Sequence, residues 1–156
     1  MIDRWDRGRV EVDRLIEQGR LTRVAANQEL ALLHLEKASV HIRSAITLRE
    51  IDSAGAFTLA YDAARLAMAA VLVNQGLKPR GEGAHAVLLE AVLAQLEPQR
   101  QQEFREFDWM RRLRNDTQYP SLDRQTALVD DVDQGVPAAQ AIVDRAARLI
   151  ELMPPY

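Results

Sequence analysis

The chain has 156 residues, of which 47% are hydrophobic and 28% charged, with a net charge of −3 and no cysteine. The lack of cysteine excludes disulfides and thiolate metal sites, and a chain of this length suits one domain that buries roughly two thirds of its surface. The acidic balance argues against a polycation that coats duplexes non-specifically. Aromatic residues are only 5% of the chain, which favours helices over sheet.

The N-terminal half predicts three helices. In chain order we expect a short helix within residues 1–20, a connection over 21–26, a second helix over 27–49 and a third over 54–74. Gly19 suits the end of the first helix, and Asn27 suits the cap of the second. We therefore treat residues 1–26 as an N-terminal helical extension and residues 27–156 as the helical bundle.

The third predicted helix is apolar on almost every side, and it is the only segment long enough to be considered as a membrane span. It carries Asp62 and Arg65 near its middle. A central charge costs about 2.5–3.5 kcal/mol on the insertion scale, so we expect a buried core helix, with the two charges in contact, and no membrane association. Residues 1–10 contain no apolar stretch of the signal-peptide kind, which favours a cytoplasmic location.

The C-terminal half predicts three more helices after a Gly- and Pro-rich loop over residues 75–83. A fourth helix spans 84–96, and a fifth begins with Pro98 in its first turn and ends before Pro120. Phe104, Phe107, Met110 and Leu113 form an apolar stripe on the fifth helix. The last helix lies within 126–156 and either begins near residue 130 and kinks at Pro137, or begins at Pro137. The fold class is thus all-α, a bundle of about five helices plus the N-terminal one.

The sequence contains no pattern typical of a metal or cofactor site. His34 and His41 share a helix face but lie about 10.5 Å apart along the axis, too far for one ion. We expect neither a metal nor a cofactor.

Two basic segments are candidate binding sites. In the first, Lys78 and Arg80 precede a predicted helix start with His85 in its first turn, where free backbone amides attract phosphate; an ordinary connection is the alternative. In the second, Arg111, Arg112 and Arg114 cluster near the end of the fifth helix. Cations are favourable at a helix C-terminus, so a solvated helix face is the alternative there.

Residues 114–119, Arg-Asn-Asp-Thr-Gln-Tyr, resemble the R-x4-6-H signature of the HEPN domain family in its R-N-x-x-x-H form. Residues 61–65 and 76–81 are similar to the central helix of that family and the loop after it. The resemblance covers about residues 27–153 and is closest to a little-characterised, mainly actinobacterial group of stand-alone HEPN domains. It implies a helical bundle that forms a homodimer. Many members are metal-independent ribonucleases, including toxins of toxin–antitoxin pairs, and others bind nucleotides or proteins.

The match has one departure, because Tyr119 stands where the family has histidine. The resemblance implies that arginine stabilises charge on the scissile phosphate, a role that Arg114 can fill, and that histidine activates the ribose 2′-hydroxyl. An unperturbed phenol has a pKa near 10, so only about one in a thousand is ionised at pH 7, and Tyr119 is a poor substitute as a base. His85 is the other candidate base, provided that the fold or a second subunit brings it to Arg114.

Three functional hypotheses follow. The first is a homodimer that binds RNA or nucleotide in a basic cleft lined by Arg114, Asn115 and Tyr119, with catalysis doubtful. The second is an active metal-independent endoribonuclease, such as a toxin whose partner is a nucleotidyltransferase antitoxin, with Tyr119 or His85 as proton carrier. The third is a protein-interaction scaffold that binds no nucleic acid.

Overall fold

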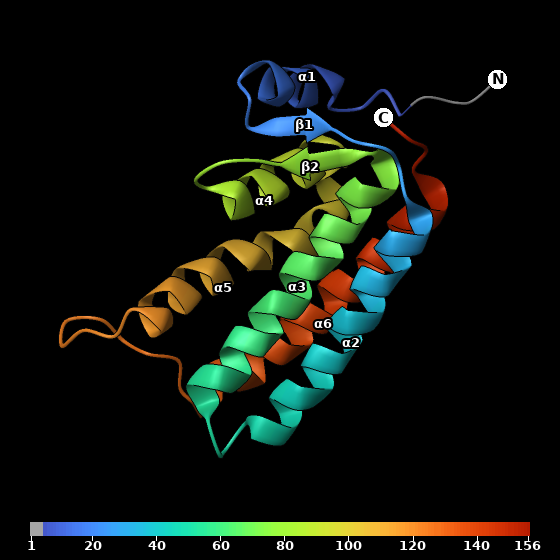
Figure 1. Cartoon of the computed structure of the whole chain (residues 1–156). Helices are drawn as coiled ribbons and strands as arrows, with labels where there is room; N and C mark the ends of the chain where they lie inside the picture. The colour runs from blue at the N-terminus through green and yellow to red at the C-terminus, as the bar shows by residue number, and fades with distance from the viewer. Residues whose placement is uncertain (1–4) are drawn as a thin grey trace.

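The computed structural model describes residues 5–156 and confirms an all-α fold (Figure 1). Within that range the elements are α1 (Arg9–Glu17), β1 (Leu21–Arg23), α2 (Gln28–Leu48), α3 (Ser53–Gln75), β2 (Leu77–Pro79), α4 (Ala84–Ala94), the 3-10 turn η1 (Pro98–Arg100), α5 (Gln102–Gln118) and α6 (Val129–Leu152). The first four residues of the expected N-terminal helix lie outside the described residues. The division of the chain at residue 26 stays a prediction.

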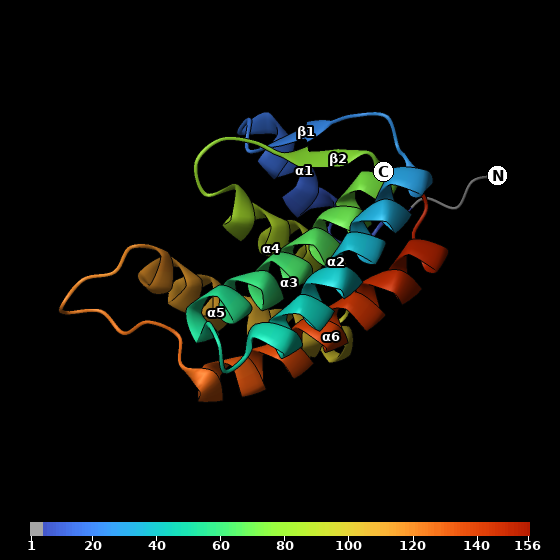
Figure 2. The ribbon, with the colours of Figure 1, turned by 60° about the horizontal axis from the view of Figure 1, so that its bottom comes forward.

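The bundle is centred on α3, which lies side by side with α2 and α6 (Figures 1 and 2). Buried side chains occur on every face of α3, as its apolar sequence predicts. Among the described helices α3 alone is long and apolar enough to cross a membrane, and 67% of its most apolar window is buried inside the protein. Burial by its own neighbours accounts for that composition, so α3 is the core helix of the bundle.

A small antiparallel sheet joins two segments that the sequence predicts as irregular connections. In β1 and β2, Leu21 pairs with Pro79 and Arg23 with Leu77. The sheet is anchored where α3 ends, because Gly76 adopts a left-handed conformation with φ of 82° and its carbonyl accepts a hydrogen bond from the Val24 amide at 2.8 Å. The expectation that residues 21–26 and 75–83 contain no strand is therefore wrong. Three-residue strands are too short to show an alternating pattern.

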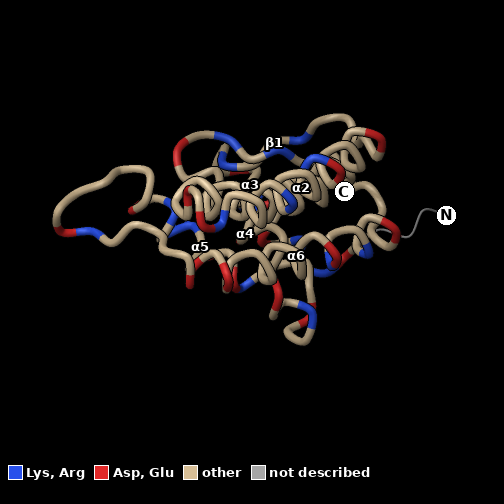
Figure 3. The backbone as a smooth tube through the Cα atoms, turned by 90° about the horizontal axis from the view of Figure 1, so that it is seen from below, with Lys and Arg blue, Asp and Glu red and all other residues tan. Residues whose placement is uncertain are grey.

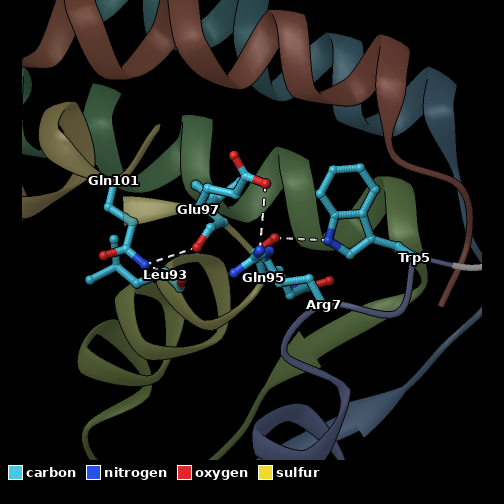
Figure 4. A network of polar contacts seen from close by, with 7 residues as sticks. Trp5, Arg7, Leu93, Gln95, Glu97 and Gln101 are labelled. Carbon is cyan, nitrogen blue, oxygen red and sulfur yellow. Dashed lines mark hydrogen bonds and ion pairs between the residues drawn. The ribbon is translucent and has the colours of Figure 1, made fainter. Parts of the chain in front are cut away.

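Side chains that precede and follow α4 in the sequence bind carbonyl groups at its C-terminal end (Figure 4). The indole nitrogen of Trp5 donates to the carbonyl of Gln95 at 2.8 Å. The side-chain amide of Gln101 donates to the carbonyls of Leu93 and Leu96, both at 2.9 Å. These bonds satisfy carbonyls that a helix end leaves without intrahelical partners. They also fix how α4 sits against the start of α5.

Two expectations about the C-terminal helices are corrected. Pro98 does not lie in the first turn of the fifth helix; it begins the separate turn η1, and α5 starts at Gln102. The last helix starts at Val129 and continues through Pro137, so the alternative start at Pro137 is wrong and the start near residue 130 is confirmed. Gly135 is buried in this helix, close to the ring of Phe57. A Cβ at this position would lie 3.0 Å from a ring carbon of Phe57, so the close approach favours glycine. The apolar stripe of α5 is core, with Phe104, Phe107 and Met110 fully buried.

Replacing Gly76 by alanine should destabilise the protein more than the same change at Gly19. Both glycines have positive φ, so each substitution pays a left-handed conformational penalty of about 1 kcal/mol. Only at Gly76 would the new Cβ also collide, at 2.6 Å from the Val24 carbonyl oxygen; at Gly19 nothing lies within 4 Å. Urea unfolding of both variants measures the difference. Equal losses would mean that the sheet anchor at Gly76 is not rigid.

Candidate functional site

Tyr61 on α3 is the point where three helices meet. Its side chain is fully buried, and its ring stacks on Phe107 of α5 with ring centroids 5.1 Å apart and an interplanar angle of 18°. Its hydroxyl group forms a hydrogen bond of 2.6 Å with Nδ1 of His85 in the first turn of α4. Tyr61 therefore fixes the start of α4 against the bundle.

Arg114 of α5 contacts the ring of the same tyrosine. Its guanidinium carbon is 5.5 Å from the centroid of the Tyr61 ring, a cation–π arrangement. Its Nε is buried, and within residues 5–156 that atom has no hydrogen-bond partner and the guanidinium has no carboxylate within ion-pair distance. The fold thus brings His85 and Arg114 to the same tyrosine and leaves the arginine charge without a counter-ion there.

A pocket of about 320 Å³ opens between the start of α4 and the face of α5. We call it the α4–α5 pocket; its lining residues are Gly81, Gly83, Ala84, His85, Ala86, Arg111 and Asn115. Gly83 caps α4 with φ of 73° and provides no side-chain cap, so no side-chain oxygen occupies the helix start. Helix N-termini of this kind attract anions, and the opposite wall carries a cation and an amide.

The buried position sets the proton states of His85 and Tyr61. Burial lowers the pKa of His85 below its ordinary 6.5, and the positive charges of Arg65 and Arg114 lower this pKa further. Burial raises the pKa of Tyr61 to about 12, although Arg114 opposes the shift. At pH 7 the phenol keeps its proton, and we assign the phenol as the donor to Nδ1, because the hydroxyl hydrogen has no other acceptor among the described residues. Neutral His85 then carries its own proton on Nε2 and acts as a donor.

The surroundings are basic although the chain is acidic. Asp108 contacts both Arg111, at 3.0 Å, and Arg112, at 2.6 Å, so one carboxylate serves two guanidinium groups. Arg114 adds a further positive charge. Along the chain as a whole, acidic and basic positions are interspersed (Figure 3). The excess of positive charge at the end of α5 is therefore local.

Not all of the residues expected at the site lie at this pocket. Lys78 in β2 and Arg80 just after it are exposed and do not line it. Arg112 and Arg114 of α5 do not line it either, although Arg114 contacts Tyr61 beside it. Tyr119 follows the last turn of α5, with 64% of its surface exposed, and does not line it either. Its role in the site stays a prediction. Tyr61 is the site residue that the sequence analysis does not single out, because it places this tyrosine only within the family-like central helix. The available signal for a special role is an aromatic residue in an alanine-rich helix.

Two smaller expectations concern charged side chains. Asp62 and Arg65 form an ion pair on α3 at 3.4 Å, as their spacing predicts. Among residues 5–156 no group of three or more His, Cys, Asp or Glu side chains is placed to hold a metal ion.

The lowered pKa of His85 predicts a pH-dependent stability. Below about pH 6.5 the unfolded chain takes up a proton on this imidazole that the folded chain resists, so the free energy of unfolding should fall as pH falls through that range. His85→Gln, whose amide can still accept from Tyr61, should flatten this dependence. His41→Gln, outside the cluster, is the control and should keep it. Urea unfolding between pH 5 and 8 tests this, and parallel curves for wild type and His85→Gln would contradict it.

Comparison with known proteins identifies the family. The HEPN domain family matches residues 29–153, from the first turn of α2 to the residue after α6. No curated protein and no solved structure gives a significant match. The matched span contains the three bundle helices and the α4–α5 pocket. This chain belongs to the HEPN domain family, whose members are generally associated with nucleotides or RNA.

Proposed function

We propose that this protein is a homodimeric HEPN domain that binds RNA or a nucleotide through phosphate in the α4–α5 pocket. The observation that carries the proposal is the meeting of His85 and Arg114 at Tyr61, beside a pocket whose polar lining consists mainly of donors. A phosphate needs such donors because its oxygens only accept.

Each donor has a distinct position in the pocket. His85 offers Nε2–H from α4, and Arg111 offers guanidinium donors from α5. Asn115, one turn beyond Arg111, adds an amide. Arg114 raises the local positive potential from its place on Tyr61. Arginine suits this role because its charge is permanent and its planar fork fits phosphate.

Homodimer formation is part of the proposal. HEPN domains often dimerise and bind RNA. Arg112 and Tyr119 are exposed close to the end of α5, where a second copy would extend the basic surface into a shared cleft. There the phenol of Tyr119 is available to stack on a base.

The alternative function is a metal-independent ribonuclease. It is favoured by one observation, that a neutral imidazole lies near an arginine. Against it, in the assigned tautomer Nδ1 accepts from Tyr61 and Nε2 carries the proton, so His85 has no free lone pair to offer to a ribose 2′-hydroxyl. Binding is therefore the first function that the site supports. A nucleotidyltransferase antitoxin as partner belongs to the ribonuclease alternative.

Replacing Arg111, the guanidinium that lines the pocket, by glutamine should weaken binding of single-stranded RNA at least about tenfold, because a charged donor to phosphate contributes roughly 1.5–3 kcal/mol. It should also reduce the dependence of affinity on salt. Arg105→Gln is the matched control: Arg105 is exposed on the same helix and bonds to Gln101. Fluorescence anisotropy with labelled oligonucleotides and mononucleotides at several salt concentrations measures both effects. Equal affinities for the two variants would refute the proposed site.

A cleavage assay separates binding from catalysis. We expect no cleavage of varied RNAs by the wild-type protein in EDTA. Cleavage that is lost in both His85→Gln and Arg114→Gln would establish the ribonuclease alternative in its place. Tyr119→His restores the family histidine, so new activity in that variant would show that residues 114–119 are the functional motif.

A further inference from the structure

A second, larger cavity lies on the other side of His85. It has a volume of about 660 Å³ and is bounded by α2, α3, α4, β2 and the segment that follows β1. We call it the aliphatic groove, because Leu30, Val73, Leu77 and Leu88 provide much of its wall. Its volume is in the range typical of small-molecule sites, roughly 300–1,000 Å³.

Basic side chains also line the groove, beside its apolar wall. Lys78 lines the groove from β2, its side chain is exposed, and no carboxylate among the described residues lies within ion-pair distance of it. Arg65 and His85 also line the groove, and Arg65 is paired with Asp62. Lys78 is therefore the cation that remains available to a ligand.

The chemistry of the wall decides between classes of occupant. Nucleobases are normally held by stacking on aromatic rings or arginine planes. Here the lining contains no Phe, Tyr or Trp ring. Beside the imidazoles of His34 and His85 and the guanidinium of Arg65, which is paired with Asp62, the lining is mostly aliphatic. An aliphatic wall with a lysine at the edge suits a molecule that has a hydrocarbon chain and one negative charge.

We propose that the aliphatic groove binds a medium-chain aliphatic carboxylate, with the chain against Leu30, Val73 and Leu88 and the carboxylate near Lys78. This site goes beyond the proposed RNA or nucleotide binding and does not depend on it, because its wall and its lysine are separate from Arg111, Arg114 and Asn115. The two cavities share only Ala84 and His85 in their linings, and His85 is the one titratable side chain among the residues that line both.

The first test uses chain length. Isothermal titration calorimetry with hexanoate, octanoate and decanoate should give affinities that rise about fourfold per methylene, the increment expected for burying one CH₂ group. Octanol, which has the same length as octanoate but no charge, should bind about tenfold more weakly, because it loses a charge-assisted contact. Affinity that is independent of chain length would overturn the proposal.

The second test uses two charge reversals, one in β2 and one just after it. Lys78→Glu should weaken decanoate binding about tenfold or more. Arg80→Glu makes the same change in charge two residues away but does not line the groove, so it should leave the affinity unchanged. Ala69→Leu, which adds bulk to the groove from α3, should also reduce binding, with circular dichroism as the check on folding. Equal affinities in the two charge variants would overturn the proposal. So would the lack of saturable decanoate binding by the wild-type protein, which would mean that the groove is empty or covered by a second copy.

Discussion

The buried hydroxyl of Tyr61 is the constraint on which the site depends. A buried hydroxyl without a partner costs about 1–3 kcal/mol, and here its partner is Nδ1 of His85. The ring that carries this hydroxyl is held by Phe107, and its face receives Arg114. Packing of the central helix α3 therefore determines where an imidazole from α4 and a guanidinium from α5 meet. The geometry of the polar site is a consequence of the apolar core.

The electrostatics of this arrangement work against stability in a way that suits a ligand site. Nε atoms of Arg111 and Arg114 are buried without hydrogen-bond partners among the described residues, and buried donors of this kind are normally satisfied. Asp108 neutralises only part of the charge nearby. Violations of this kind in a well-packed fold are expected where a function needs them. A bound phosphate would supply the missing negative charge.

The sequence predicts the bundle because that part of the fold depends on local patterns. The apolar α3, the stripe of Phe104 and Phe107, and the helix ends at Asn27 and Gly76 can each be recognised from a few neighbouring residues. The sheet could not be predicted, since strands of three residues carry no usable period. The convergence of His85 and Arg114 on Tyr61 could not be predicted either. It joins two helices through Tyr61, and no pattern in the sequence specifies which helices pack together.

The imidazole of His85 lines both the α4–α5 pocket and the aliphatic groove. Its protonation state therefore affects anion binding in both cavities. Its pKa is lowered by burial and by nearby arginines, so the imidazole is neutral when both cavities are free of anions. An anion in either cavity would favour the protonated form of His85, and protonation adds a positive charge that faces the other cavity. By thermodynamic linkage the effect is reciprocal. A single imidazole held by a core tyrosine thus gives this small bundle a physical route by which proton uptake offsets the direct repulsion between an aliphatic carboxylate in one cavity and a phosphate in the other.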